Sequence, residues 1–172
     1  MSNKFTPKAQ YALNLALNLA SEMGHSYIGS EHLLLGLINT PESAAARILT
    51  ARGASFEAIK TTVLEITGIG SPGPVSPSDM TPRMKRIIES SAYESSKSDH
   101  AYIGTEHVLA CILKMENCNA CKRLAALGLD NEDLGMELDR IIGRGDALMT
   151  RGTLQLTART KKILEFAKIE AA

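Results

Sequence analysis

Two glutamates occupy the same local sequence context at separate places in the chain. Glu31 follows Ser30 and Glu106 follows Thr105, and each stands at the start of an apolar run typical of a helix. A carboxylate at that position complements the helix dipole, which stabilises a helix by about 0.3–1 kcal/mol. One such glutamate would need no further role. Because the pattern occurs twice, a binding role stays open for both.

Histidines and cysteines lie near these glutamates. Cys118-x2-Cys121, with Cys111 and a histidine nearby, is one pattern that could hold zinc. The histidines form two pairs whose spacing is not the i, i+4 spacing of helical metal ligands. We therefore expect the histidines to be structural, with rings that bond loop carbonyls. The four histidines are His25, His32, His100 and His107.

Both glutamates belong to a tandem repeat. The segment Tyr27-Ile28-Gly29-Ser30-Glu31-His32 recurs as Tyr102-Ile103-Gly104-Thr105-Glu106-His107, and the offset of 75 residues holds without a gap over most of each copy. At this offset the three cysteines match Gly36, Ser43 and Ala46, which are all small. The thiols are therefore expected to fill small-residue positions, and we predict no metal site.

Each copy is predicted to form four short helices. The helix starts are indicated by Ser, Thr or Asn caps and the helix ends by Gly or Pro. The segment 69–79, rich in Gly, Pro and Ser, is predicted to be an extended linker. The predicted helices begin at Thr6, Ser30, about Glu42, Ser55, Thr81, Thr105, Asn117 and Asn131, with Thr6, Ser30, Ser55, Thr81 and Thr105 as caps.

The predicted domain organisation has five parts. Neither copy alone has a generous core, so we expect the two to pack as one pseudo-twofold, all-α domain. Leu156-Thr157-x-Arg159 resembles Met80-Thr81-x-Arg83, which favours the start of a third copy and hence a fragment of a longer protein; an ordinary C-terminal helix is the alternative. The parts are repeat 1 (4–68), a linker (69–79), repeat 2 (80–143), a linker (144–156) and a helix (157–172).

Composition excludes several classes of function. The 19 basic and 19 acidic residues cancel, which argues against nucleic-acid binding through bulk charge. No apolar run approaches the roughly 20 residues of a membrane span.

Three cysteines and a polar N-terminus predict a cytoplasmic protein with reduced thiols. There is no phosphate-binding Gly-x4-Gly-Lys-Ser/Thr loop and no plausible catalytic set, so we predict a non-enzyme that needs no cofactor.

The repeat resembles the N-terminal repeat domain of Clp proteins, the AAA+ unfoldases that feed the Clp protease. The resemblance rests on Phe5-Thr6-x-x-Ala9 and on the run from Gly24 to Leu37, and its detail is closer to the ClpC type than to ClpA or ClpB. The second copy departs from the family pattern at Asp99, at Ala110-Cys111 and at Arg123, which stands where repeat 1 has Ile48. The family's residue roles therefore transfer less directly to the second repeat.

The resemblance implies a domain that docks substrate and adaptor proteins. In ClpC-type proteins the glutamates matching Glu31 and Glu106 bind the guanidinium of phosphoarginine on tagged substrates. A carboxylate suits this role because it accepts a forked guanidinium pair that Lys cannot reproduce. The phosphoryl group would lie against a helix N-terminus, for which Thr6 and Thr81 are the candidates.

The opening helix of repeat 2 is a second candidate binding surface. Phe5 and Met80 are predicted to be apolar anchors on one groove between the repeats, with Lys85 and Glu89 beside them; a solvated helix face is the alternative. The expected partners are substrates, adaptors and ATPase modules of the same chain or complex, with the Clp protease indirectly, and neither nucleic acid nor a membrane. The alternative function is a stand-alone Clp-repeat adaptor without ATPase modules.

Overall fold

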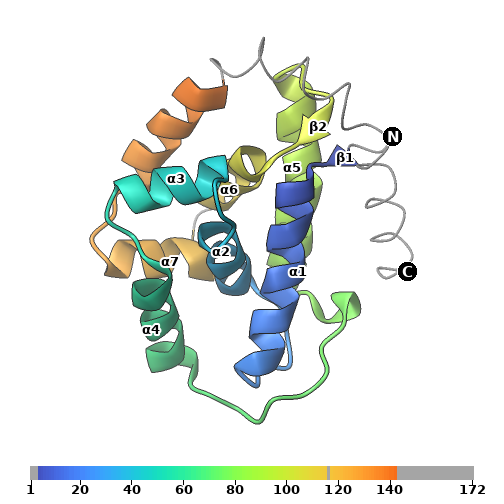
Figure 1. The fold of residues 1–172 in the computed structure, drawn as a ribbon, viewed down its shortest axis with the longest axis vertical. Coiled ribbons are helices and arrows are strands. Elements are labelled where there is room, and N and C mark those ends of the chain that lie inside the picture. Colours follow the sequence, from blue (N-terminus) through green and yellow to red (C-terminus); the bar gives the residue numbers. More distant parts are fainter. Residues whose placement is uncertain (1–3, 116, 143–172) are drawn as a thin grey trace.

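The computed structural model describes residues 4–115 and 117–142, and most of this part of the chain is helical (Figure 1). The predicted linker 144–156 and helix 157–172 lie outside the described residues. Residues 131–142 form a helix that follows α7. The labelled elements are β1 (Lys4–Phe5), α1 (Pro7–Glu22), α2 (Ser30–Ile38), α3 (Ala44–Ala51), α4 (Phe56–Thr67), the 3-10 helix η1 (Pro77–Asp79), α5 (Pro82–Lys97), β2 (Tyr102–Ile103), α6 (Thr105–Lys114) and α7 (Asn119–Ala126).

Most helix ends follow the prediction. The Thr6 and Thr81 hydroxyls accept the backbone N–H groups of Ala9 and Met84, each at 3.1 Å, and a proline follows each threonine. Helix α3 begins two residues later than predicted, because Ser43 is its cap and Glu42 takes a left-handed φ of 59°. The residue that corresponds to Glu42 in the second copy, Asn117, has a φ of 64°, and α7 begins later for the same reason.

The predicted capping role of Ser30 and Thr105 is wrong. The caps of α2 and α6 are Gly29 and Gly104, and both hydroxyls point to the other repeat. Ser30 accepts the N–H of Ala120 at 3.0 Å, in the first turn of α7. Thr105 accepts the N–H of Ala45 at 3.3 Å, in the first turn of α3. Each hydroxyl therefore satisfies a helix end across the boundary between the copies.

The core is centred on α2. Every residue from Ser30 to Ile38 is buried, which matches its nearly unbroken apolar sequence. Helix α1 packs closely on α2 because Gly36 has no side chain; a Cβ there would lie 2.3 Å from the Ala12 carbonyl oxygen. Helix α2 also contacts α5, α6 and α7 of the second copy.

The two repeats form one pseudo-twofold domain, as predicted. Strand β1 pairs in parallel with β2, so Phe5 lies opposite Ile103 of the other repeat. The matching bridge joins Met80 to Ile28. The linker runs from the end of α4 to the start of α5 along the lower edge of the view (Figure 1). Each repeat therefore begins with a segment bound to its partner repeat.

Candidate functional site

A glycine stands two residues before each glutamate and lies against its carboxylate. Glu31 and Glu106 are the second residues of α2 and α6, and both are buried. A Cβ on Gly29 would lie 2.3 Å from Glu31 Oε1, and a Cβ on Gly104 would lie 2.3 Å from Glu106 Oε1. The glycines thus leave room for the carboxylates, while their own φ values lie in the ordinary extended range.

A pair of histidines fixes the loop before each glutamate. In repeat 1 the Gly29 N–H donates to His32 Nδ1 at 2.9 Å. This bond places the proton of neutral His32 on Nε2, which is 2.7 Å from His25 Nδ1. The chain of bonds ends at the Gly68 carbonyl, 2.8 Å from His25 Nε2. The predicted structural role is confirmed for this histidine, which bonds a loop carbonyl.

The second repeat contains the same arrangement. The Gly104 N–H donates to His107 Nδ1 at 2.9 Å, and His107 Nε2 lies 2.7 Å from His100 Nδ1. Burial lowers the pKa of His32 and of His107 to about 4. The His100 ring stacks on Tyr102 with ring centres 5.0 Å apart. The stacked tyrosine is thereby fixed beside Glu106.

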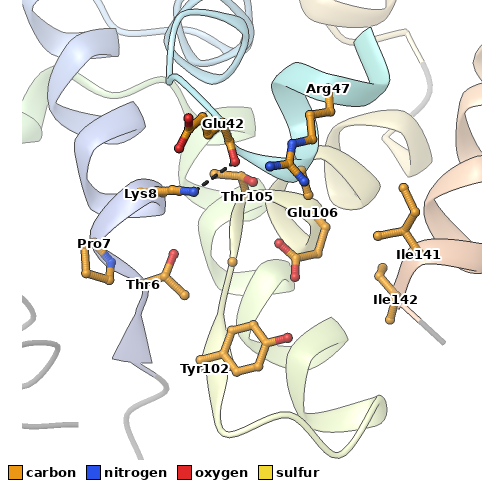
Figure 2. A pocket seen from close by; sticks show the side chains of 12 residues that line it. Thr6, Pro7, Lys8, Glu42, Arg47, Tyr102, Thr105, Glu106, Ile141 and Ile142 are labelled. Carbon is orange, nitrogen blue, oxygen red and sulfur yellow. Dashed lines mark hydrogen bonds between the residues drawn. The ribbon is translucent and has the colours of Figure 1, made fainter. Parts of the chain in front are cut away.

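Glu106 faces an open cavity of about 440 Å³ between the repeats. Figure 2 shows its carboxylate between Tyr102 and Arg47, with Thr6 across the cavity and Ile141 and Ile142 on the other side. Helices α1 and α3 of repeat 1 contribute one wall, and repeat 2 contributes the rest. The complete lining is Thr6, Pro7, Lys8, Glu42, Ala44, Arg47, Tyr102, Gly104, Thr105, Glu106, Ile141 and Ile142.

The cavity is lined by charges of both signs, the carboxylates of Glu106 and Glu42 and the cationic groups of Lys8 and Arg47. Burial raises the pKa of Glu106, and bonds from its own backbone N–H and from the Tyr102 hydroxyl act in the opposite direction. Lys8 and Arg47 are exposed at the rim, and the Lys8 ammonium donates to the Glu42 carbonyl at 2.9 Å. The N-terminal end of α1 adds a partial positive charge. A ligand with a cationic end and an anionic end would match this arrangement.

Glu31 faces a smaller cavity of about 120 Å³. The Asn119 amide nitrogen lies 3.4 Å from both carboxylate oxygens, and the Tyr27 hydroxyl donates to Oε2 at 3.1 Å. Burial and the charge of Glu31 raise the pKa of Tyr27, which keeps it a donor. Arg123 from α7 also lines the cavity. The cavity is lined by Glu31, Val63, Ile66, Thr67, Asn119 and Arg123.

The structure changes which predicted residues belong together. Thr6 of repeat 1 lines the cavity of Glu106 in repeat 2, so that site is built from both copies. Thr81 does not line the Glu31 cavity. Arg123, a departure located in repeat 2, lines the cavity of the glutamate of repeat 1. The departure of repeat 2 from the family pattern at Arg123 therefore alters the cavity of Glu31, which belongs to repeat 1.

The predicted partner surface is only partly exposed. Phe5 is 8 % exposed and packs in the core beside β2, so its predicted role as a surface anchor is wrong. Met80 is half-buried at its bridge with Ile28. Lys85 and Glu89 are exposed on α5. The two apolar residues join the repeats to each other.

Several polar residues that line the cavities were missed from the sequence. Lys8 and Arg47 were not singled out, although each follows a helix cap by a few residues. Asn119 was also missed. The offset of 75 residues aligns it with Ala44, so the sequence alone shows that an amide replaces a methyl group at this position. A search for polar residues that differ between the copies would have found it.

The cysteines form no site of their own. Cys111, Cys118 and Cys121 are buried free thiols, and the Cys121 thiol donates to the Ile112 carbonyl at 3.1 Å. Across residues 4–115 and 117–142, no cluster of His, Cys, Asp or Glu could hold a metal ion. In the same part of the chain, no helix combines the length and the apolar character that crossing a membrane requires.

The family model and the similar sequences both identify this chain with Clp proteins. The model of the Clp repeat (R) N-terminal domain matches residues 4–81 and again 79–172. The chaperone protein ClpB of Oceanobacillus iheyensis is 33 % identical over 147 residues, covering 86 % of this chain and 18 % of that protein. Chloroplastic ClpC1 of Oryza sativa subsp. japonica is 33 % identical over 152 residues, covering 88 % and 17 %. The chain thus spans less than a fifth of either relative.

Solved structures share the fold. The N-terminal domain of the chaperone ClpD from Arabidopsis thaliana superposes with a TM-score of 0.66 at 22 % identity, covering 78 % of this chain and 94 % of that one. A ClpV N-domain in complex with a VipB peptide superposes with a TM-score of 0.61 at 19 % identity, covering 81 % and 87 %. The helical fold described above is therefore one that Clp N-domains share.

Proposed function

Because the chain belongs to the Clp repeat (R) N-terminal domain family, we propose that it is the substrate- and adaptor-binding module of a Clp unfoldase. Its relatives are several times longer and include ATP-binding subunits of the Clp protease, so the module would act joined to ATPase modules of the same chain or complex. The VipB peptide bound by a ClpV N-domain supports protein binding by this fold. On this proposal the module itself is cytoplasmic, catalyses no reaction and needs no cofactor.

The proposed ligand is phosphoarginine on a tagged protein, bound in the Glu106 cavity. The open 440 Å³ cavity around a buried carboxylate is the observation that supports it best. The guanidinium would pair with Glu106, where low local polarity strengthens a charge-assisted bond. The phosphoryl group would lie toward Thr6, Lys8 and Arg47, at the N-terminal end of α1.

Calorimetric titration tests this proposal. The wild-type chain should bind a phosphoarginine peptide and should bind the arginine twin at least tenfold more weakly, because the twin lacks the phosphoryl contacts. Glu106→Gln keeps the shape of the side chain and removes its charge, so it should weaken binding of the tagged peptide by about 10- to 100-fold, as expected for a charged hydrogen bond. Glu57→Gln, an exposed change on α4 outside both cavities, is the matched control and should have no effect.

Equal affinity for both peptides would contradict recognition of the phosphoryl group. Failure of the wild-type chain to bind either peptide would contradict the proposed ligand altogether. Adaptor docking on the helix surfaces would then be the remaining form of the proposal.

A further inference from the structure

The two glutamate cavities share part of their lining at the repeat offset but differ nearly fourfold in volume, about 440 Å³ against 120 Å³. Four positions line both cavities, among them Glu106, which matches Glu31, and Ile141, which matches Ile66. The start of α1 lines only the large cavity, and no residue of α5 lines the small one. Two further differences lie in the helix that the other repeat contributes. Asn119 of α7 stands where α3 has Ala44, and Arg123 stands where α3 has Ile48.

Asn119 supplies Glu31 with a partner that Glu106 lacks. Its amide nitrogen lies 3.4 Å from each carboxylate oxygen, on the side from which a forked guanidinium would approach both. At the other cavity the corresponding residue, Ala44, has only a methyl group. A guanidinium that entered the Glu31 cavity would first have to displace the amide.

Arg123 places a second obstacle in the same cavity. The side chain is only 7 % exposed, and its Nη1 donates to the Thr62 carbonyl at 3.4 Å. Its Nε is buried and has no hydrogen-bond partner among the described residues. The cavity of Glu31 therefore already contains a guanidinium of the chain itself. A second cationic group would meet this buried charge, whereas the cationic side chains that line the Glu106 cavity, Lys8 and Arg47, are exposed and screened by water.

We propose that this chain has one ligand site, the Glu106 cavity, and that Asn119 and Arg123 close the Glu31 cavity to guanidinium ligands. The inference rests on the proposed function and adds its stoichiometry and the residues that set it. The pseudo-twofold domain would then be asymmetric in binding although it is nearly symmetric in fold.

Titration with the same phosphoarginine peptide tests the inference through stoichiometry. The wild-type chain should bind one peptide. Glu106→Gln should lose at least tenfold in affinity, whereas Glu31→Gln should stay within twofold of the wild type. The double variant Asn119→Ala/Arg123→Ile copies the residues of α3 into α7 and should raise the stoichiometry from one to two.

A mirror variant guards against loss of folding. Ala44→Asn places an amide beside Glu106, as Asn119 is placed beside Glu31, and should weaken peptide binding at least tenfold while the helical circular dichroism is kept. Two peptides bound to the wild-type chain, or loss of binding on Glu31→Gln, would overturn the inference and leave the proposed ligand supported. No binding by the wild-type chain would overturn the proposed ligand, and the inference with it.

Discussion

The buried histidine pairs make folding stability sensitive to mild acid. The pKa of His32 and of His107 is lowered to about 4 in the folded chain, mainly by burial, against about 6.5 for an exposed histidine. Between these values the unfolded chain binds more protons than the folded chain, so stability falls as the pH falls. The loss should reach about 2 kcal/mol for each histidine by pH 5. The raised pKa of Glu106 acts in the opposite direction and offsets part of it.

Thermal unfolding between pH 7.5 and 5 measures this effect, and Tm should fall steadily below pH 6.5. His32→Gln is a suitable comparison, since a glutamine at this position can still accept the Gly29 N–H but does not titrate. The variant should lose less stability than the wild type over the same pH range. An identical pH dependence in both chains would exclude His32 as a source of the effect.

Residues differ in how far their roles follow from sequence. The paired histidines were correctly predicted to be structural, because a side chain that recurs in both copies at non-metal spacing is best explained by a local bond. Ser30 has the sequence context of a helix cap, yet its hydroxyl bonds Ala120 of the other repeat at 3.0 Å. Local propensity indicates that a helix begins there, but it contains no information about a partner 90 residues away.

At the scale of elements, close packing of α1 on α2 depends on one glycine. A methyl group at Gly36 would lie 2.3 Å from the Ala12 carbonyl oxygen and 3.2 Å from the Ala16 nitrogen, and both atoms belong to backbone that cannot rotate away. Gly36→Ala should therefore force the two helices apart and lower stability by about 1–3 kcal/mol, as overpacking does in well-packed cores. Urea unfolding followed by circular dichroism measures the change.

Gly135 is the matched control for this substitution. It lies within the helix at 131–142, and a Cβ there would meet no atom within 4 Å. Gly135→Ala should therefore raise stability by about 0.5–1 kcal/mol, because alanine loses less backbone freedom on folding. The corresponding rise in Tm is about 2–4 °C per kcal/mol for a chain of this size. Similar effects at both positions would show that helix propensity, and not the α1–α2 contact, governs Gly36.

Helix positions were easier to predict than helix neighbours. Caps such as Ser55, and Gly68 at the end of α4, fixed the ends of that helix from the sequence. The late start of α3 was missed because a positive φ at Glu42 is unusual for glutamate. Which helix lies beside which glutamate could not be deduced at all, since a duplication is equally compatible with cavities within one copy and cavities between copies.

On the scale of the whole molecule, the two copies share one core. All nine residues of α2 are buried, partly against α5, α6 and α7 of the second copy. Hydrogen bonds also cross between the copies at the starts of α3 and α7. Strand β1 pairs with β2, and an isolated bridge joins Ile28 to Met80. The small core of each copy was enough to predict the pseudo-twofold packing, whereas the cross-repeat cavities became evident only from the structure.

This shared core predicts that neither copy folds alone. A chain divided within the linker, between Gly73 and Pro74, leaves halves with small cores and with the second-copy face of α2 exposed to water. Each half should lack a cooperative thermal transition by circular dichroism. Mixing the halves should restore helicity and a single transition, because α2 and the exchanged segments regain their partners. If either half melted cooperatively alone, the repeats would be independent domains, and each cavity would be assembled by docking after folding.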